Sequence, residues 1–308
     1  MTRAFGIIKF WEMALSEDLI IQKIFEEEGQ GPGTRQTYYE SLEKELNAPI
    51  IALVTSFVYP VIINDSDADM LESILQKTDI SKGFYLLLSS PGGDGLAAER
   101  IINVCRAYSG TGKYAVIVPS KAKSAATMIC LGASEILMSK TSELGPIDPQ
   151  IIIEDKWFSV FNIIKSYEEL FGLAVKEKGN LQPYLQQLAN YDARVIEEFK
   201  SALDLSKDIA IKVLKTGQFQ GKKERTIESK INLFLNPKQV KVHSRPIYAA
   251  EALSRGINII LQDIKGPSWP MIYELYVRLN HYVSTHRRTK CIESKDYSFF
   301  ATIPKEEV

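Results

Sequence analysis

Apolar and polar positions change their spacing in a regular way along the central part of the chain. Short apolar runs alternate with segments in which apolar residues recur at helical spacing. Because strands covered on both faces are continuously apolar, runs such as "YLLL" and "AVIV" indicate a largely parallel sheet made of repeated strand-helix units. The predicted strands lie at 48–57, 83–90, 114–120 and 135–139, and the predicted helices at 66–78, 95–108 and from Ser124 onward.

The flanking regions are predicted to be mostly helical. Before the alternating region, apolar positions predict amphipathic helices over 5–27 and 34–47, separated by the turn "GQGPGT". After residue 150, helices are predicted at 158–178, 183–216, in "GKKERTIESKINLFL" and in "WPMIYELYVRLNHYVS", with a short helix and strand in "RPIYAAEALSRGINIIL". We therefore divide the chain into an N-terminal helical extension (1–48), an α/β domain (49–265) and a C-terminal helix with a tail (266–308).

Two predictions concern the C-terminal part. The stripe of Trp269, Ile272, Tyr276, Leu279 and Tyr282 is expected to pack in the core or to form an oligomer contact. The short basic run "HRRTK" at 286–290 is expected to be solvated surface.

Composition excludes several classes of function. Among 308 residues, acidic and basic side chains nearly cancel to a net charge of -1, which argues against a nucleic-acid partner. Three cysteines and three histidines are scattered without ligand spacing, so we expect no metal site and no cofactor, with Cys105 and Cys130 as buried apolar residues. No signal-peptide pattern and no apolar run of about 20 residues occurs, which predicts a cytoplasmic protein without a membrane span.

The first stretch with possible chemistry is "LLLSSPGGDGLAAER", residues 86–100. A buried strand ends in Ser-Ser-Pro-Gly-Gly, and a helix begins shortly afterwards. The stretch is consistent with an ordinary strand-to-helix turn. Alternatively, Gly92 and Gly93 present backbone N–H groups at the carboxyl end of a parallel sheet, where fixed dipoles stabilise a developing oxyanion.

The second stretch is "KAKSAATMICLGASEIL", residues 121–137, in which Ser124 opens a helix of small residues. Serine is a common N-cap, because its oxygen accepts the free N–H groups of a first turn. A serine at a helix N-terminus is also well placed as a nucleophile, with the N–H of Ala125 directed toward an oxyanion formed beside it. The small residues Ala125, Ala126 and Gly132 are expected to let this helix approach the sheet closely.

The combination of "SSPGG" with a serine-opened helix about 30 residues later resembles the Clp/crotonase superfamily. Within it, the chain is most similar to the serine dehydrogenase proteinase family, relatives of signal peptide peptidase A. The resemblance also rests on "LGPIDPQ" at 144–150 and on "HSRPIYAAEALSRGINI" at 243–259, and it covers roughly residues 50–260. It implies a serine peptidase on a Clp/crotonase fold of repeated ββα units, with a helical C-terminal part.

The resemblance also implies site residues. Ser124 aligns with the family nucleophile, and Gly93 and Ala125 align with the residues whose N–H groups form the oxyanion hole. Relatives usually have a glycine within two residues after the serine, whereas Ala125 and Ala126 follow it here. Alanine still supplies an N–H, but the space beside the nucleophile is expected to be narrower.

The general base is not evident from the motifs. The Clp branch uses a histidine, but the equivalent stretch "ELGPIDPQ" has none, so a lysine as in the signal-peptide-peptidase branch is expected. We favour Lys165, which follows Ser124 by 41 residues on an apolar helix, although a surface lysine fits the same pattern. Lys123 is adjacent to the serine and Lys156 has acidic neighbours, so both are less suitable, and His243 is a further alternative.

Three functions stay open at this point. The first is a serine endopeptidase that hydrolyses peptide or protein substrates through an acyl-enzyme, with Ser124 and Lys165 as a dyad. The second is a crotonase-type acyl-CoA enzyme that uses the same N–H groups and has no need of Ser124. The third is a non-catalytic scaffold subunit of the same fold. The family implies a homo-oligomer, and neither its size nor a need for a partner can be derived from the residues.

Overall fold

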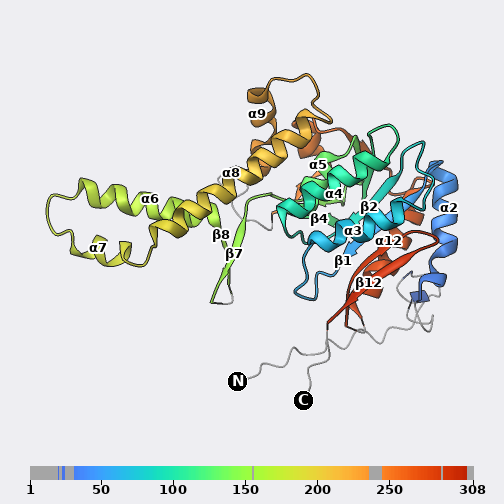
Figure 1. Cartoon of the computed structure of the whole chain (residues 1–308), viewed down its shortest axis with the longest axis horizontal. Coiled ribbons are helices and arrows are strands. Elements are labelled where there is room, and N and C mark those ends of the chain that lie inside the picture. The colour runs from blue at the N-terminus through green and yellow to red at the C-terminus, as the bar shows by residue number, and fades with distance from the viewer. Residues whose placement is uncertain are drawn as a thin grey trace, which may run out of the picture.

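A computed structural model describes residues 20, 23–24, 31–154, 156–235, 245–285 and 287–303. The helix predicted over 5–27 lies almost entirely outside these residues. The fold is a mixed α/β architecture with a central sheet and helices on both faces, as a Clp-like fold requires (Figure 1).

The helices agree with most of those predicted. Predicted helix 183–216 is divided, because α7 ends at Leu188 and Asp192 begins α8 by accepting a hydrogen bond from the backbone N–H of Arg194. The helices are η1 (Pro32–Thr34), α2 (Gln36–Leu46), α3 (Asp65–Leu75), α4 (Gly95–Tyr108), α5 (Ala125–Gly132), α6 (Val160–Lys176), α7 (Gln182–Leu188), α8 (Ala193–Lys215), α9 (Glu224–Leu235), α11 (Ala249–Ser254) and α12 (Trp269–Ser284).

Two antiparallel strand pairs, β7–β8 and β11–β12, were not predicted from the sequence. The strands are β1 (Ile50–Thr55), β2 (Tyr85–Ser89), β3 (Ala115–Val118), β4 (Lys121–Ala122), β5 (Glu135–Met138), β6 (Glu143–Leu144), β7 (Gln150–Ile153), β8 (Lys156–Ser159), β9 (Ile247–Tyr248), β10 (Ile259–Leu261), β11 (Arg288–Glu293) and β12 (Ser298–Thr302).

The large sheet has the order β10-β5-β3-β2-β1-β11-β12, and its first five strands are parallel. All six residues of β1 are buried, which confirms the prediction of a parallel sheet covered on both faces. Ile51 and Leu53 pack under α3, α4, α5 and the end of α8. Ile50, Ala52 and Val54 face the opposite side, under α2 and α12.

Short extended segments form a second layer beside the large sheet. Each of β1, β2, β3 and β5 is followed by a short extended segment, and these segments lie side by side. Strands β4, β6 and β9 form a small sheet, the bridge between Ser90 and Ala122 continues it, and a bridge joins Ile63 to Gly93. In the first three units a helix comes next, namely α3, α4 and α5. This arrangement confirms the predicted ββα repetition, and it collects the turns that precede the helices at one edge of the molecule.

The C-terminal region completes the sheet. Strand β11 pairs antiparallel with β1, and β12 pairs with β11. The prediction that "HRRTK" is solvated surface is therefore wrong for Thr289 and Lys290, which are 3% and 4% exposed. Arg288 is half-buried, with its guanidinium 4.1 Å from the centroid of the Tyr282 ring, Arg287 is exposed as predicted, and His286 lies outside the described residues. Thr289 and Lys290 are buried because the strand covers the edge of β1.

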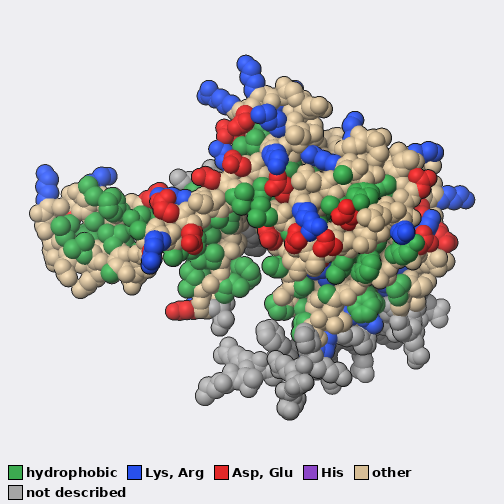
Figure 2. All heavy atoms as spheres, viewed as in Figure 1, with side chains coloured by type: hydrophobic (Ala, Val, Ile, Leu, Met, Phe, Trp, Pro, Cys, Tyr) green, Lys and Arg blue, Asp and Glu red, His purple; other side chains and the backbone are tan. Residues whose placement is uncertain are grey.

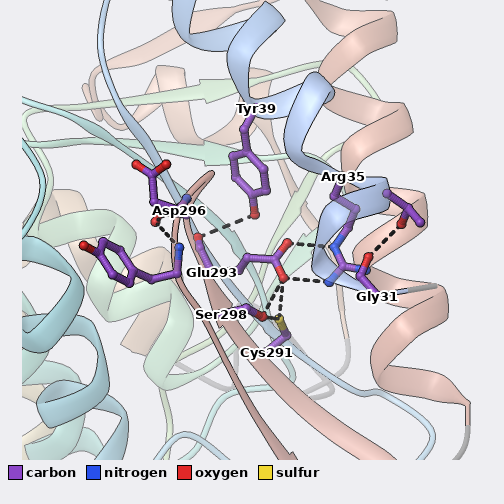
Figure 3. Close-up of polar contacts among 10 residues, drawn as sticks. Gly31, Arg35, Tyr39, Cys291, Glu293, Asp296 and Ser298 are labelled. Carbon is purple, nitrogen blue, oxygen red and sulfur yellow. Dashed lines mark hydrogen bonds and ion pairs between the residues drawn. The ribbon is translucent and has the colours of Figure 1, made fainter. Parts of the chain in front are cut away.

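A buried polar network joins the N-terminal helices to this strand (Figure 3). Arg35 donates two hydrogen bonds to the Glu293 carboxylate, at 2.7 and 2.6 Å, and both side chains are at most 1% exposed. Ser298 donates a further bond of 2.6 Å to the same carboxylate, and the Tyr39 hydroxyl donates to the Glu293 carbonyl. Burial raises the pKa of the neighbouring Cys291 thiol, so it stays protonated in this network.

Most of the predicted aromatic stripe belongs to the core. Trp269, Ile272, Leu279 and Tyr282 are at most 4% exposed and pack with α2 against the sheet, while Tyr276 is half-buried. The prediction that the stripe packs in the core is confirmed for these four residues.

An arm of helices extends from the body. Helices α6 and α7 with the first part of α8 form it, and the hairpin β7–β8 lies at its base (Figure 1). Apolar side chains are exposed on the arm and on the hairpin (Figure 2). The largest exposed fractions belong to Val175 at 70%, Trp157 at 63% and Ile152 at 58%. No described helix is both long and apolar enough to cross a membrane.

Candidate active site

Ser124 occupies a strained backbone position immediately before α5. Its φ is 50° and its ψ is -120°, a combination that costs a non-glycine residue on the order of 1–3 kcal/mol. Although it stands at the N-cap position, its side chain makes no capping hydrogen bond. A serine on a sharp strand-to-helix turn of this kind presents its Oγ free of the helix, as nucleophilic serines do in other hydrolases.

The surrounding backbone holds this turn in place. The N–H of Lys123 donates to the carbonyl of Ser90 and the N–H of Ser90 to that of Lys121, both at 3.0 Å, so the chain is tied to the end of β2 on each side of Ala122. On the other side, Thr127 Oγ1 donates to the carbonyl of Ala122 at 2.7 Å and accepts from the N–H of Gly145 at 3.0 Å. The strained position of Ser124 is therefore supported by bonds to two neighbouring segments, at Ser90 and Gly145, and by one bond across the turn itself.

The glycine turn after β2 lies directly against Ser124. Gly92 has a φ of 110°, and a Cβ placed on it would lie 2.6 Å from Ser124 Cβ and 2.7 Å from the carbonyl oxygen of Lys123. No side chain fits there, so glycine is required both by conformation and by close approach. Its N–H donates to Ser90 Oγ at 3.1 Å.

The two N–H groups proposed for the oxyanion hole have no acceptor among the described residues. Neither the N–H of Gly93 nor that of Ala125, the first residue of α5, forms a hydrogen bond there. Gly93 is held by its neighbours instead: the N–H of Ile63 donates to the carbonyl of Gly92 at 2.8 Å, and the N–H of Asp94 donates to that of Ile63 at 2.9 Å. Two unoccupied donors thus flank a serine whose Oγ also has no hydrogen-bond partner among these residues.

Helix α5 is buried throughout, as its small residues predict, but its closest approach is to another helix. A Cβ on Gly132 would meet the Ile102 side chain of α4 at 2.7 Å. Ala125 and Ala126 are 1% and 0% exposed. The close contact at Gly132 is therefore with α4, and the approach to the sheet stays a prediction.

Lys123 is bonded to β6. Its Nζ donates to the carbonyl of Leu144 at 3.1 Å and pairs with the Glu143 carboxylate at 2.8 Å. Burial lowers the pKa of Lys123, and the ion pair with Glu143 partly opposes this shift. The side chain passes over Gly145, where a Cβ would lie 2.7 Å from Lys123 Cδ. Lys123 thus joins β4 to β6.

The other candidate bases lie elsewhere. Lys165 is on α6 of the arm, where it is 44% exposed and forms an ion pair of 3.4 Å with Glu169. Lys156 is exposed on β8, and His243 lies outside the described residues. Within the described part of one chain, no lysine or histidine forms a hydrogen bond with Ser124.

Some residues that shape the site were not found from the sequence. Ile63 acts through its backbone and Thr127 through its side-chain hydroxyl, in the bonds given above, and no pattern in the sequence marks them. Asp67 lies three residues after Asn64, and this spacing is typical of a capping box. Its carboxylate accepts a hydrogen bond from the N–H of Asn64 at 2.9 Å, so the spacing of Asn64 and Asp67 was the signal for this contact in the sequence.

Comparison with known proteins agrees with the geometry. Residues 48–228 match the family model described as ClpP-like SDH-type serine proteinase, which is more than half of the chain. The segment 243–259 lies beyond that match. Two uncharacterized proteins of Methanocaldococcus jannaschii, MJ1495 and MJ0137, are 34% and 35% identical over 94 residues. These matches cover 30% of this chain and 31% and 32% of the relatives, so the chain matches about a third of their length.

Proposed function

Because this chain belongs to the family of ClpP-like SDH-type serine proteinases, we propose that it is a serine endopeptidase with Ser124 as nucleophile and Lys165 as general base. The observation that carries the proposal is the geometry around Ser124. A strained serine at a helix N-terminus lies against a glycine turn beside two N–H groups, and neither its Oγ nor these N–H groups have a hydrogen-bond partner among the described residues. A serine needed only as a cap would bond its own helix.

The proposed reaction has two stages. Ser124 Oγ attacks the scissile carbonyl carbon while its proton passes to the amine of Lys165, and the carbonyl oxygen becomes an oxyanion held by the N–H groups of Gly93 and Ala125. Collapse of this intermediate breaks the C–N bond, and the leaving amine takes the proton from lysine. Water then attacks the acyl-enzyme with the same amine as base, which releases the acid and restores Ser124.

Lys165 reaches the nucleophile in this proposal from a second copy of the chain. In one chain it lies on the arm, away from α5, in an exposed ion pair of a kind that contributes little to stability (Figure 1). A lysine acts as a base near neutral pH only when burial lowers the pKa of its amine. Covering of the arm by another copy would supply that burial, and the exposed apolar residues Phe171, Leu173 and Val175 offer a surface for it (Figure 2).

Labelling with a fluorophosphonate probe tests the nucleophile. We expect covalent modification at Ser124, its complete loss in Ser124→Ala, and a strong reduction in Lys165→Ala. Lys156→Ala is the matched control, because Lys156 is also exposed at the base of the arm and has no role in the proposed reaction. A folded, assembled protein that does not label would contradict the proposal and favour the non-catalytic scaffold.

A mixing experiment tests the origin of the base. Ser124→Ala and Lys165→Ala are each expected to be inactive against peptide substrates. Mixed subunits that exchange should regain part of the activity, since one copy then supplies an intact serine and another an intact lysine. If activity does not return in mixtures whose exchange is verified by mass spectrometry, the base does not come from a second copy.

A further inference from the structure

A buried ion pair connects the last part of the sheet to the segment beside the glycine turn. Lys290 of β11 and Asp67 of α3 are 4% and 0% exposed. The Nζ of Lys290 donates to both carboxylate oxygens of Asp67, at 2.8 and 2.7 Å. Its third hydrogen bond, at 2.8 Å, goes to the backbone carbonyl of Ile62. All three ammonium protons are therefore used, which is how a buried lysine avoids an unsatisfied charge.

Residues 62–64 link this ion pair to the proposed oxyanion hole. Asp67 accepts a hydrogen bond from the N–H of Asn64 at 2.9 Å, so the pair holds the segment 62–64 at both ends. Between these two anchors, Ile63 bonds the carbonyl of Gly92 and the N–H of Asp94. A Cβ on Gly93 would lie 2.2 Å from the carbonyl oxygen of Ile63. The two backbones are therefore in direct contact, without an intervening side chain.

We propose that the Lys290–Asp67 pair is a positioning device for the oxyanion-binding turn, acting through Ile63 on Gly93. It rests on the proposed function, since it concerns the hole in which the oxyanion of that reaction forms. Neither side chain touches substrate in this proposal. Their effect is to hold the N–H of Gly93 at a fixed place beside Ser124, because an oxyanion-hole donor is effective only when it is already aligned before charge develops.

An ion pair is suited to this task for a geometric reason. Packing of apolar side chains alone leaves the direction of a backbone carbonyl loosely determined. Three charge-assisted hydrogen bonds from one ammonium group determine the position of Ile62 relative to both β11 and α3. The turn is thereby tied to the central sheet through residues 62–64.

The test uses two variants that differ in which bonds they remove. Lys290→Met/Asp67→Asn removes both charges and the donor to Ile62, while the asparagine keeps an acceptor for Asn64. Asp67→Asn alone keeps the Lys290 bond to Ile62, but it leaves the Lys290 ammonium buried without its anionic partner and is therefore expected to destabilise the fold more than the double variant. The matched control is Arg35→Met/Glu293→Gln, which neutralises a second buried pair of the same scaffold that forms no hydrogen bond or ion pair with residues 62–64 or 92–94.

Two readouts separate positioning from general loss of stability. Below the unfolding transition, hydrogen exchange at the amides of Ile63 and Asp94 should be at least about tenfold faster in the double variant than in the control pair. For a peptide ester substrate, kcat should fall by about 10- to 100-fold with KM nearly unchanged, since loss of a full oxyanion donor costs about 100- to 1,000-fold. Asp67→Asn, which keeps the Lys290 bond to Ile62, should show smaller changes in the same direction.

The outcomes distinguish this inference from the proposed function. A wild-type protein that neither labels at Ser124 nor turns over substrate contradicts the proposed function, and the positioning role falls with it. An active wild type whose Lys290→Met/Asp67→Asn variant has the kcat of the control pair contradicts the positioning role alone. The same holds if exchange at Ile63 and Asp94 is unchanged, or if KM rises while kcat is preserved.

Discussion

Gly92→Ala is the sharpest single test of the geometry around Ser124. The new Cβ would lie 2.6 Å from Ser124 Cβ and 3.2 Å from the N of Ala125. Because ordinary contact begins at 3.4 Å, the turn and the nucleophile must separate by 0.8 Å or the backbone must rotate. The φ of 110° adds a conformational cost of roughly 1–2 kcal/mol for any residue with a Cβ.

The two costs have different consequences. The conformational cost lowers the free energy of unfolding. The displacement lowers the rate of acylation, since a misplacement of about 1 Å costs on the order of 100-fold. We expect the rate constant for fluorophosphonate labelling of Ser124 to fall by about this factor in Gly92→Ala at protein concentrations and temperatures where the variant is fully folded.

Gly112→Ala is the matched control. Gly112 also has a positive φ, 69°, but a Cβ placed there meets nothing within 4 Å. Gly112→Ala should lose roughly 1–2 kcal/mol in urea denaturation, Gly92→Ala should lose more because of the additional overlap, and only Gly92→Ala should label slowly. If Gly92→Ala labels within about threefold of Gly112→Ala, the contact between the glycine turn and Ser124 does not govern the reaction, and the reasoning is wrong.

Two further predictions concern stability. Arg35→Met should lower the free energy of unfolding by about 3–5 kcal/mol, because it leaves the Glu293 carboxylate buried without its partner; urea midpoints measure this loss, and recovery in Arg35→Met/Glu293→Gln is expected, whereas an equal loss in both would contradict the argument. Burial raises the pKa of the thiols of Cys105, Cys130 and Cys291, so the unfolded chain loses these protons first as the pH rises. The stability that these thiols contribute is therefore fully present below about pH 8.5. Above this pH the free energy of unfolding falls by up to about 1.4 kcal/mol per pH unit for each thiol. Urea titrations from pH 8 to 10 should show a shallower slope in a variant with all three cysteines replaced by alanine, and an identical slope would refute the assignment.

The elements that could be predicted are those determined by residues within their own segment. Strands β2 and β3 are continuously apolar and α4 has helical spacing, so each is determined by residues within its own segment. Ser124 and the turn at Gly92 and Gly93 were found because their residue types and separation match a known motif. The division between α7 and α8 also had a local signal, the N-cap Asp192, which the prediction of a single helix overlooked.

The parts that were missed depend on distant residues. The sequence around Lys290 is basic and predicts exposed chain, yet its burial follows from pairing with β1 and from Asp67, 223 positions away. The positive φ of Ser124 has no signal in residue type, because serine is tolerated at ordinary caps as well. The location of Lys165 on an arm follows from how α6, α7 and α8 pack together, which helical spacing alone does not determine.

The pairing of β11 with β1 also sets an order of events during synthesis. Residue 290 emerges from the ribosome 166 residues after Ser124, so the proposed nucleophile and its glycine turn are present long before the ammonium that is proposed to position the turn. Until then β1 is an open sheet edge, the kind of edge that promotes aggregation, and contacts of such long range form late in folding. A nascent chain thus carries its proposed nucleophile before the proposed oxyanion hole is complete. When residues 288–293 pair with β1, they cover its open edge and, in this proposal, position the glycine turn in the same step.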